Sequence, residues 1–132
     1  MFSKLLLSLS ILFISLLLAC NDDGYSINPF SSSSSITNPT PKDYLQNDNA
    51  DIFLLDGYVY SNAQDVEWVT ELEYEVGDQI GEITKQADKA SQFNNETANR
   101  LPIGTKIFET NTPAYIAIVN GEEILYLKMV EG

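Results

Sequence analysis

The sequence predicts a mainly β domain, a small antiparallel sheet curled as a partial barrel or sandwich. Two observations support this fold class. Short β-rich runs recur between turn residues over residues 48–132, and Asn120-Gly121 separates two of these runs. An Asn-Gly pair in that setting is the strongest short-range signal of a β-hairpin. With 132 residues in all, the chain has room for one such domain.

Five predicted strands precede the final hairpin, and four of them are short β-rich runs. Residues 52–55 and 58–60 are rich in β-branched, aromatic and other apolar residues, and Gly57 between them suggests a bulge or a close approach of two backbones. Further strands are expected at residues 79–86 and 105–109. Short strands with little helix between them favour an antiparallel arrangement.

The segment between the second and third of these runs carries two other patterns. Residues 63–70 are compatible with a short helix, for which Asp65 is available as the N-cap. Trp68 in this segment is expected in the core, and contact with a ligand is the alternative. Next, apolar and acidic residues alternate with a period of two, which indicates a half-buried strand before a turn at Gly77-Asp78. The alternating residues are Glu71, Leu72, Glu73, Tyr74, Glu75 and Val76.

The final hairpin has a register that its turn determines. Residues 114–119 and 122–130 flank Asn120-Gly121, and a two-residue turn places Tyr115 opposite Tyr126. One face, which includes Ile116 and Leu125, is expected to be core. The other face is mixed in polarity, and tyrosines are favoured interface anchors, so Tyr115, Ile124 and Tyr126 are candidate binding residues. The alternative is that another part of the chain covers this second face.

The first 20 residues have the layout of a secretory signal. A positive start at Lys4 precedes an almost unbroken apolar run over residues 5–18, and the small Ala19 stands just before Cys20. The apolar run is shorter than the roughly 20 residues that a membrane-spanning helix needs. Residues 1–19 are therefore expected to be a signal peptide.

The end of this segment, Leu17-Leu18-Ala19-Cys20, resembles the lipobox of bacterial lipoprotein precursors. The resemblance implies a diacylglyceryl group on the Cys20 thiol and cleavage between Ala19 and Cys20. It also implies a lipid anchor in the cell membrane, with the chain on the extracytoplasmic side. The alternatives are an ordinary signal peptide or an uncleaved N-terminal helix, with Cys20 incidental. The stretch Leu101-Pro102-Ile103-Gly104-Thr105 resembles small bacterial lipoproteins of unassigned function, which implies no activity.

Residues 20–47 are predicted to be a disordered tether that follows the lipidated Cys20. This stretch contains the serine run at 31–35, together with Pro39 and Pro41, and few residues that could form a core. Such a composition buries too little apolar surface to offset the entropy of ordering the chain. Residues 48–132 are therefore expected to form the domain.

The composition excludes several classes of function. The chain has 19 acidic and 7 basic residues, a net charge of −12, and such a surface repels phosphates and anionic headgroups. No nucleic-acid partner is therefore expected. Histidine is absent and Cys20 is the only cysteine, which excludes Ser-His-Asp and Cys-His catalysis, Cys/His zinc sites and an internal disulfide. The sequence thus assigns no catalytic residue, no metal ligand and no cofactor.

The expected function is that of a lipid-anchored envelope protein with a small non-enzymatic binding or interaction domain. The sequence does not identify the partner, which is an envelope protein or another ligand. The acidic stretch 65–82 is expected to be a solvated face, and its spacing fits no EF-hand loop. Two alternatives remain open, a small carboxylate-dependent envelope hydrolase and a weak cation-binding module.

Overall fold

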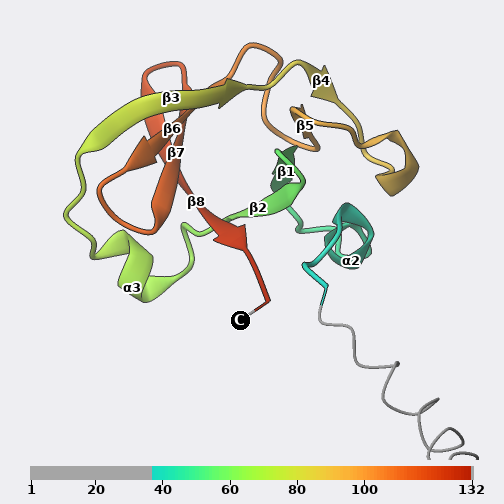
Figure 1. The fold of residues 1–132 in the computed structure, drawn as a ribbon, viewed down its shortest axis with the longest axis horizontal. Helices are drawn as coiled ribbons and strands as arrows, with labels where there is room; N and C mark the ends of the chain where they lie inside the picture. The colour runs from blue at the N-terminus through green and yellow to red at the C-terminus, as the bar shows by residue number, and fades with distance from the viewer. Residues whose placement is uncertain (1–36, 132) are drawn as a thin grey trace, which may run out of the picture. The chain divides into compact units, whose positions relative to one another are not determined.

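The structure, a computed structural model, describes residues 37–131, which form one compact unit (Figure 1). The predicted fold class is confirmed, because the unit is mainly β and its strands form a single curled sheet of eight strands. The strands are β1 (Ile52–Leu55), β2 (Tyr58–Asn62), β3 (Val76–Glu82), β4 (Lys85–Gln86), β5 (Thr97–Ala98), β6 (Lys106–Thr110), β7 (Ala114–Val119) and β8 (Glu122–Met129). Three short helical segments accompany them, α2 (Pro41–Leu45), α3 (Glu67–Thr70) and the 3-10 turn η2 (Ala90–Gln92).

The order of the strands explains the curl of the sheet. From edge to edge the order is β3-β6-β7-β8-β2-β1-β5-β4, with antiparallel neighbours except for the parallel pair β4 and β5. The two edge strands, β3 and β4, are consecutive in the chain, with only Ile83 and Thr84 between them. Because a two-residue link joins the opposite edges, the sheet must curl into the half-barrel seen in Figure 1.

Glu96 forms hydrogen bonds that connect β3 and β4 to β1. Its backbone N–H donates to the Leu54 carbonyl at 2.7 Å, and its own carbonyl accepts from the N–H groups of Thr84 and Lys85. Its side-chain Oε2 accepts from the N–H of Glu82 at 3.0 Å. Glu96 does this with a φ of 65°, a left-handed conformation that is uncommon outside glycine.

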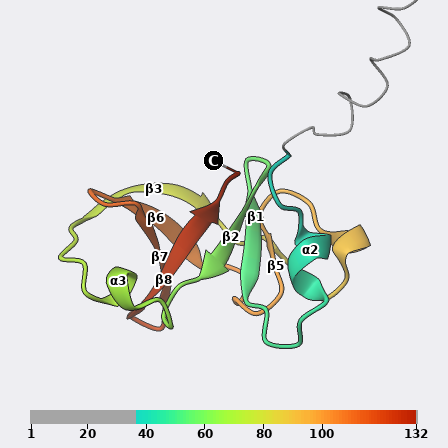
Figure 2. The same cartoon turned by 90° about the horizontal axis from the view of Figure 1, so that it is seen from below.

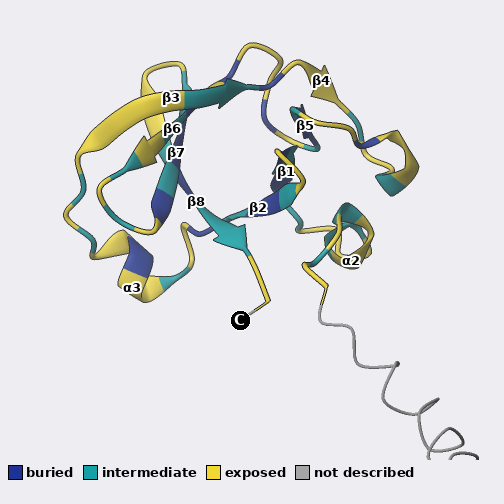
Figure 3. Cartoon of the chain, viewed as in Figure 1, coloured by how far each residue is buried: buried dark blue, intermediate teal, exposed yellow. Residues whose placement is uncertain are grey.

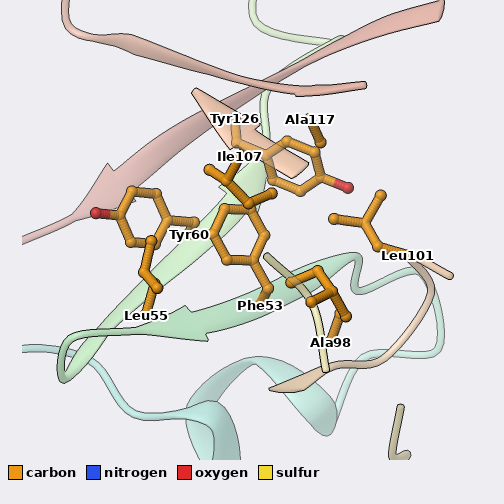
Figure 4. Packing of buried hydrophobic residues seen from close by; sticks show 9 residues of the cluster. Phe53, Leu55, Tyr60, Ala98, Leu101, Ile107, Ala117 and Tyr126 are labelled. Atoms are coloured by element: carbon orange, nitrogen blue, oxygen red, sulfur yellow. The ribbon is translucent and has the colours of Figure 1, made fainter. Parts of the chain in front are cut away.

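The concave side of the sheet holds the inner core. The side chain of Leu55 in β1 is so close to Gly81 in β3 that a Cβ on Gly81 would lie 2.8 Å from Leu55 Cδ1. These strands are not neighbours in the sheet, so the contact crosses the hollow of the half-barrel. Phe53 lies at the centre (Figure 4), with its ring stacked on Tyr60 at 4.7 Å between centroids and tilted against Tyr126 at 5.0 Å.

The convex side is covered in two places. Val69 of α3 packs with Ile116 and Leu125, together with Ala63 and Ala114. At the other end of the sheet, Tyr44 and Leu45 of α2 pack against buried Ile52 and Val59, together with Phe93. Figure 2 shows α2 beside β1. Both faces of the central strands are therefore core.

Two hairpin turns have the left-handed residues that a type I′ turn requires. Asn120 and Gly121 have φ values of 53° and 80°, and the predicted register of β7 and β8 is confirmed, with Tyr115 opposite Tyr126. Asp56 and Gly57 have φ values of 52° and 85° and join β1 to β2. Gly57 therefore serves a tight turn between two strands, where the sequence had suggested a bulge or a close backbone approach.

The predicted strand at residues 72–76 and the turn at Gly77-Asp78 are wrong. Residues 71–75 pair with no strand of the described sheet, although Leu72 and Tyr74 do pack inward while the glutamates between them are exposed. Gly77 lies within β3, whose first half is exposed (Figure 3). The ladder between β3 and β6 shifts register there, and a Cβ on Gly77 would lie 3.2 Å from Glu109 Cγ. Gly77 therefore lies at a bulge with a close neighbour, and not in a turn.

The short helix expected near residues 63–70 is present, but two of its details differ. Its N-cap is Val66 rather than Asp65. Trp68 is 52% exposed and is not a core residue, whereas its neighbour Val69 is fully buried. A helix of four residues can turn only one side chain toward the sheet, and here that side chain is Val69.

The folded unit begins earlier than the sequence indicated. Residues 41–47 were expected to belong to the tether, but α2 lies at residues 41–45 and covers Ile52 and Val59. Thr40 begins this helix, because its N–H and Oγ1 both donate to Asp43 Oδ2, at 2.7 and 3.0 Å. Residues 1–36, which include Cys20, the signal segment and most of the expected tether, lie outside the described residues. Within residues 37–131, no helix is long and apolar enough to cross a membrane.

Candidate functional site

A polar cleft lies where β1 begins and β2 ends, beside α2. Its volume is about 480 Å³, within the range of about 300–1,000 Å³ that small-molecule sites occupy. The side chains that line it are mostly amides and carboxylates. The lining residues are Asp43, Tyr44, Asn47, Asn49, Ala50, Asp51, Ser61, Asn62, Gln64, Asp65 and Arg100.

Three of the amide side chains in this cleft have a fixed orientation. The side-chain oxygen of Asn47 accepts from the N–H of Asn49 at 2.9 Å, and that of Asn62 accepts from the N–H of Gln64 at 2.8 Å. Gln64 Oε1 accepts from the N–H of Leu125 at 3.0 Å. Because a backbone N–H can pair only with the amide oxygen, each NH₂ group is the part left to donate elsewhere.

Asp51 is held by two donors from the sheet. Its Oδ1 accepts from the Tyr126 hydroxyl and its Oδ2 from Asn62 Nδ2, both at 2.8 Å. Burial, followed by the nearby Asp51 carboxylate, raises the pKa of Tyr126, so the hydroxyl keeps its proton and remains a donor. The carboxylate of Asp51 is thus fixed against the inner core.

The rest of the cleft wall is also attached to the sheet. Asn99 makes two hydrogen bonds to the backbone at the start of β1. Its Oδ1 accepts from the N–H of Ile52 and its Nδ2 donates to the carbonyl of Ala50, each at 2.7 Å. Arg100 Nη2 donates to the carbonyl of Asp48 at 2.8 Å. Backbone and side-chain bonds from Thr40 lower the pKa of Asp43, so this carboxyl is ionised at neutral pH.

The hairpin residues proposed from the sequence as a binding surface belong to the core. Tyr126 is fully buried, and Tyr115 and Ile124 are partly buried against the inner core. The Tyr115 ring packs edge-on against Tyr60, at 4.9 Å between centroids. The expectation of an exposed interaction face is therefore corrected, because the curl of the sheet closes over this face. The remaining predicted sites, Ala19 and Cys20, lie outside the described residues.

The acidic stretch forms a solvated surface. Glu71, Glu73 and Glu75 are all exposed, in the segment that joins α3 to β3. Among residues 37–131, no group of three or more acidic, histidine or cysteine side chains is placed so that it could hold a metal ion.

Sequence reasoning missed the cleft for an identifiable reason. Its residues come from segments far apart in the chain, at positions 43–51, 61–65 and 100. Residues 43–47 of the first segment were assigned to the tether on their composition. The one available signal was Thr40-Pro41 followed by Asp43, which is typical of a helix start.

No family model, curated protein or solved structure matches the chain.

Proposed function

We propose that this chain is an extracytoplasmic lipoprotein, anchored through Cys20, whose domain binds a ligand in the polar cleft without catalysis. The observation that carries the anchor is the coincidence of three features in one segment. A positive start, an apolar run of signal-peptide length and the only cysteine of the chain occur in that order, and the run ends in Leu17-Leu18-Ala19-Cys20.

The anchor suits the charge of the chain. With a net charge of −12 the chain is repelled by anionic membrane surfaces, so it needs a hydrophobic attachment. Each buried methylene contributes about 0.8 kcal/mol, and stable anchoring takes about two acyl chains, which a diacylglyceryl group provides.

The cleft chemistry supports binding more than hydrolysis. The alternative hydrolase would need one carboxyl that keeps a proton at neutral pH to act as the general acid. The pKa of Asp43 is lowered, which is the opposite direction. Asp51 uses both of its oxygens to accept hydrogen bonds from Tyr126 and Asn62, which orients it as a fixed acceptor.

The anchor is tested with Cys20→Ser. Wild-type chain should fractionate with membranes, and its N-terminal peptide should have the mass of a diacylglyceryl-modified Cys20. Cys20→Ser should be released or remain as an uncut precursor, and the neighbouring Asn21→Ser should behave as wild type. Membrane association of Cys20→Ser at the mature size would refute the anchor.

The cleft is tested by capture from the protein's own envelope. Tagged full chain should retain a component that the double variant Asn47→Asp, Gln64→Glu loses. Both substitutions keep the acceptor oxygen that pairs with a backbone N–H and replace the NH₂ donor. Asn111→Asp is the matched control, because its oxygen accepts from the N–H of Glu75 outside the cleft. Equal retention by the double variant would rule out the cleft as the binding site.

A further inference from the structure

We propose that the ligand of the polar cleft is an uncharged saccharide, held by the fixed amides and carboxylates of its walls. This inference rests on the proposed binding function and names its ligand class. It depends on the polarity of the cleft, on the mixture of donors and acceptors, on the local charge and on the position of Tyr44.

The polarity of the lining excludes an apolar ligand. Most small-molecule pockets are lined predominantly by apolar and aromatic side chains. Here Ala50 is the only aliphatic lining residue, and Tyr44 is the only aromatic one. A ligand that fills this cleft must therefore present polar groups over most of its surface, because buried polar groups without partners are costly.

The cleft offers donors and acceptors side by side. The NH₂ groups of Asn47 and Gln64 donate, since their oxygens are already engaged by backbone N–H groups. The carboxylates of Asp51 and Asp65 can only accept. A hydroxyl group is both donor and acceptor, so adjacent hydroxyls on a sugar ring match such a wall. The hydrogen bonds that orient Asn47, Gln64 and Asp51 lower the entropy lost on binding.

The charges of the lining favour an uncharged ligand. Three carboxylates, Asp43, Asp51 and Asp65, face one guanidinium, Arg100, which disfavours phosphates and other anions. A purely cationic ligand could pair with the carboxylates. It would leave the NH₂ donors of Asn47 and Gln64 without acceptors in the ligand, so it would match only half of the cleft wall.

Tyr44 supplies the apolar surface that a sugar ring also requires. It lies in α2, partly buried, and packs against the cluster of Ile52 and Val59 while lining the cleft. Its ring is thus fixed by the convex side of the sheet. The C–H groups on the face of a pyranose can pack against such a ring, while its hydroxyls reach the amides.

The test uses the full chain in lipid nanodiscs and saturation-transfer difference NMR, with empty nanodiscs as the blank. The probes are cellotetraose and tetra-N-acetylchitotetraose as uncharged oligosaccharides, glucose 6-phosphate as an anion and spermine as a cation. We expect saturation transfer to at least one oligosaccharide and none to glucose 6-phosphate. The double variant Asn47→Asp, Gln64→Glu should weaken oligosaccharide binding about tenfold, since two hydrogen bonds of about 0.5–1.5 kcal/mol are lost.

Matched controls separate the possible results. Asn111→Asp makes one of the same amide-to-acid changes outside the cleft and should bind as wild type does. Transfer to spermine alone, or to neither oligosaccharide, would overturn the saccharide assignment while leaving the anchor and the binding module standing. Equal oligosaccharide binding by wild type and the double variant would overturn the assignment to this cleft. The wild-type measurements with the four probes test the saccharide assignment by themselves, so this test stands even if the double variant does not fold.

Discussion

At the scale of single residues, the most demanding position in the fold is Glu96. It has a left-handed backbone without being glycine, and its backbone and carboxylate bond to four residues from three parts of the sheet. A strained residue persists only where its surroundings determine its conformation. The hydrogen bonds of Glu96 to β1 on one side and to the β3–β4 link on the other keep its backbone in this conformation.

Glu96→Ala should lower the free energy of unfolding by about 1–3 kcal/mol, because the partly buried N–H of Glu82 loses its acceptor. Glu96→Gln keeps an acceptor oxygen and serves as the control, with a smaller loss expected. Urea denaturation followed by circular dichroism measures both. Equal stability of the alanine and glutamine variants would show that the carboxylate bond contributes nothing.

The buried tyrosines make stability fall at alkaline pH. Burial raises the pKa of Tyr60 to about 12 and also raises that of Tyr126. Because a raised pKa favours the neutral form in the fold, its stabilising contribution is complete below the unfolded pKa of about 10 and is lost as pH rises above it. Tyr126→Phe should therefore flatten the decline in urea midpoint between pH 9 and pH 11.5. Burial, followed by the nearby Glu123, also raises the pKa of Tyr74, but its hydroxyl makes only an exposed 3.4 Å contact, so Tyr74→Phe should flatten the decline less than Tyr126→Phe does. An unchanged slope for Tyr126→Phe would contradict this account.

At the scale of elements, two small helices decide which strand faces are buried. α3 contributes Val69 and α2 contributes Tyr44 and Leu45 to opposite ends of the convex side. Neither helix is long enough to be stable by itself, since isolated helices need about 12–15 residues. Each exists because it covers apolar residues of the sheet.

Removal of α2 should therefore expose the strands beneath it. A chain that begins at Asp48 loses the cover of Ile52 and Val59 and should melt at a lower temperature than one that begins at Thr37. Leu45→Ala in the longer chain should reproduce part of the loss, and Lys42→Ala, at an exposed position, should not. Differential scanning calorimetry makes the comparison. Identical melting temperatures for the two chains would return the domain boundary to Asp48.

At the scale of the whole molecule, the large negative charge is spread rather than focused. The exposed glutamates of residues 71–75 alternate with the inward-packed Leu72 and Tyr74, so they repel one another through solvent without forming a cage. Hard cations need several oxygen ligands at about 2.3–2.6 Å, and a stripe does not provide them.

Calorimetric titration with calcium should accordingly show no binding tighter than the millimolar range of weak sites. The comparison is between wild type and Glu73→Gln at low ionic strength, where charge effects are largest. Both should give the same featureless titration. A micromolar site that disappears in Glu73→Gln would establish the cation-binding alternative.

The sequence by itself determined the local features of this domain. Asn120-Gly121 specified the last hairpin and its register because a two-residue turn leaves no freedom in pairing. The alternation of Leu72 and Tyr74 with glutamates correctly indicated which side chains face inward, because the apolar side chains are buried and the charged ones stay in solvent even where the segment pairs with no strand.

Only the tertiary structure decided which faces are covered and where the cleft lies. The mixed face around Tyr126 became core because the link between β3 and β4 curls the sheet over it. Strand pairing brings the cleft residues together: the β1–β2 hairpin sets Asp51 beside Asn62, and β5, which pairs with β1, is followed by Arg100. The physical reason is that burial depends on contacts between residues far apart in the chain. Local pattern and composition report only on neighbours, so they indicated the last hairpin and several strands, but not the exposed start of β3 and not the site.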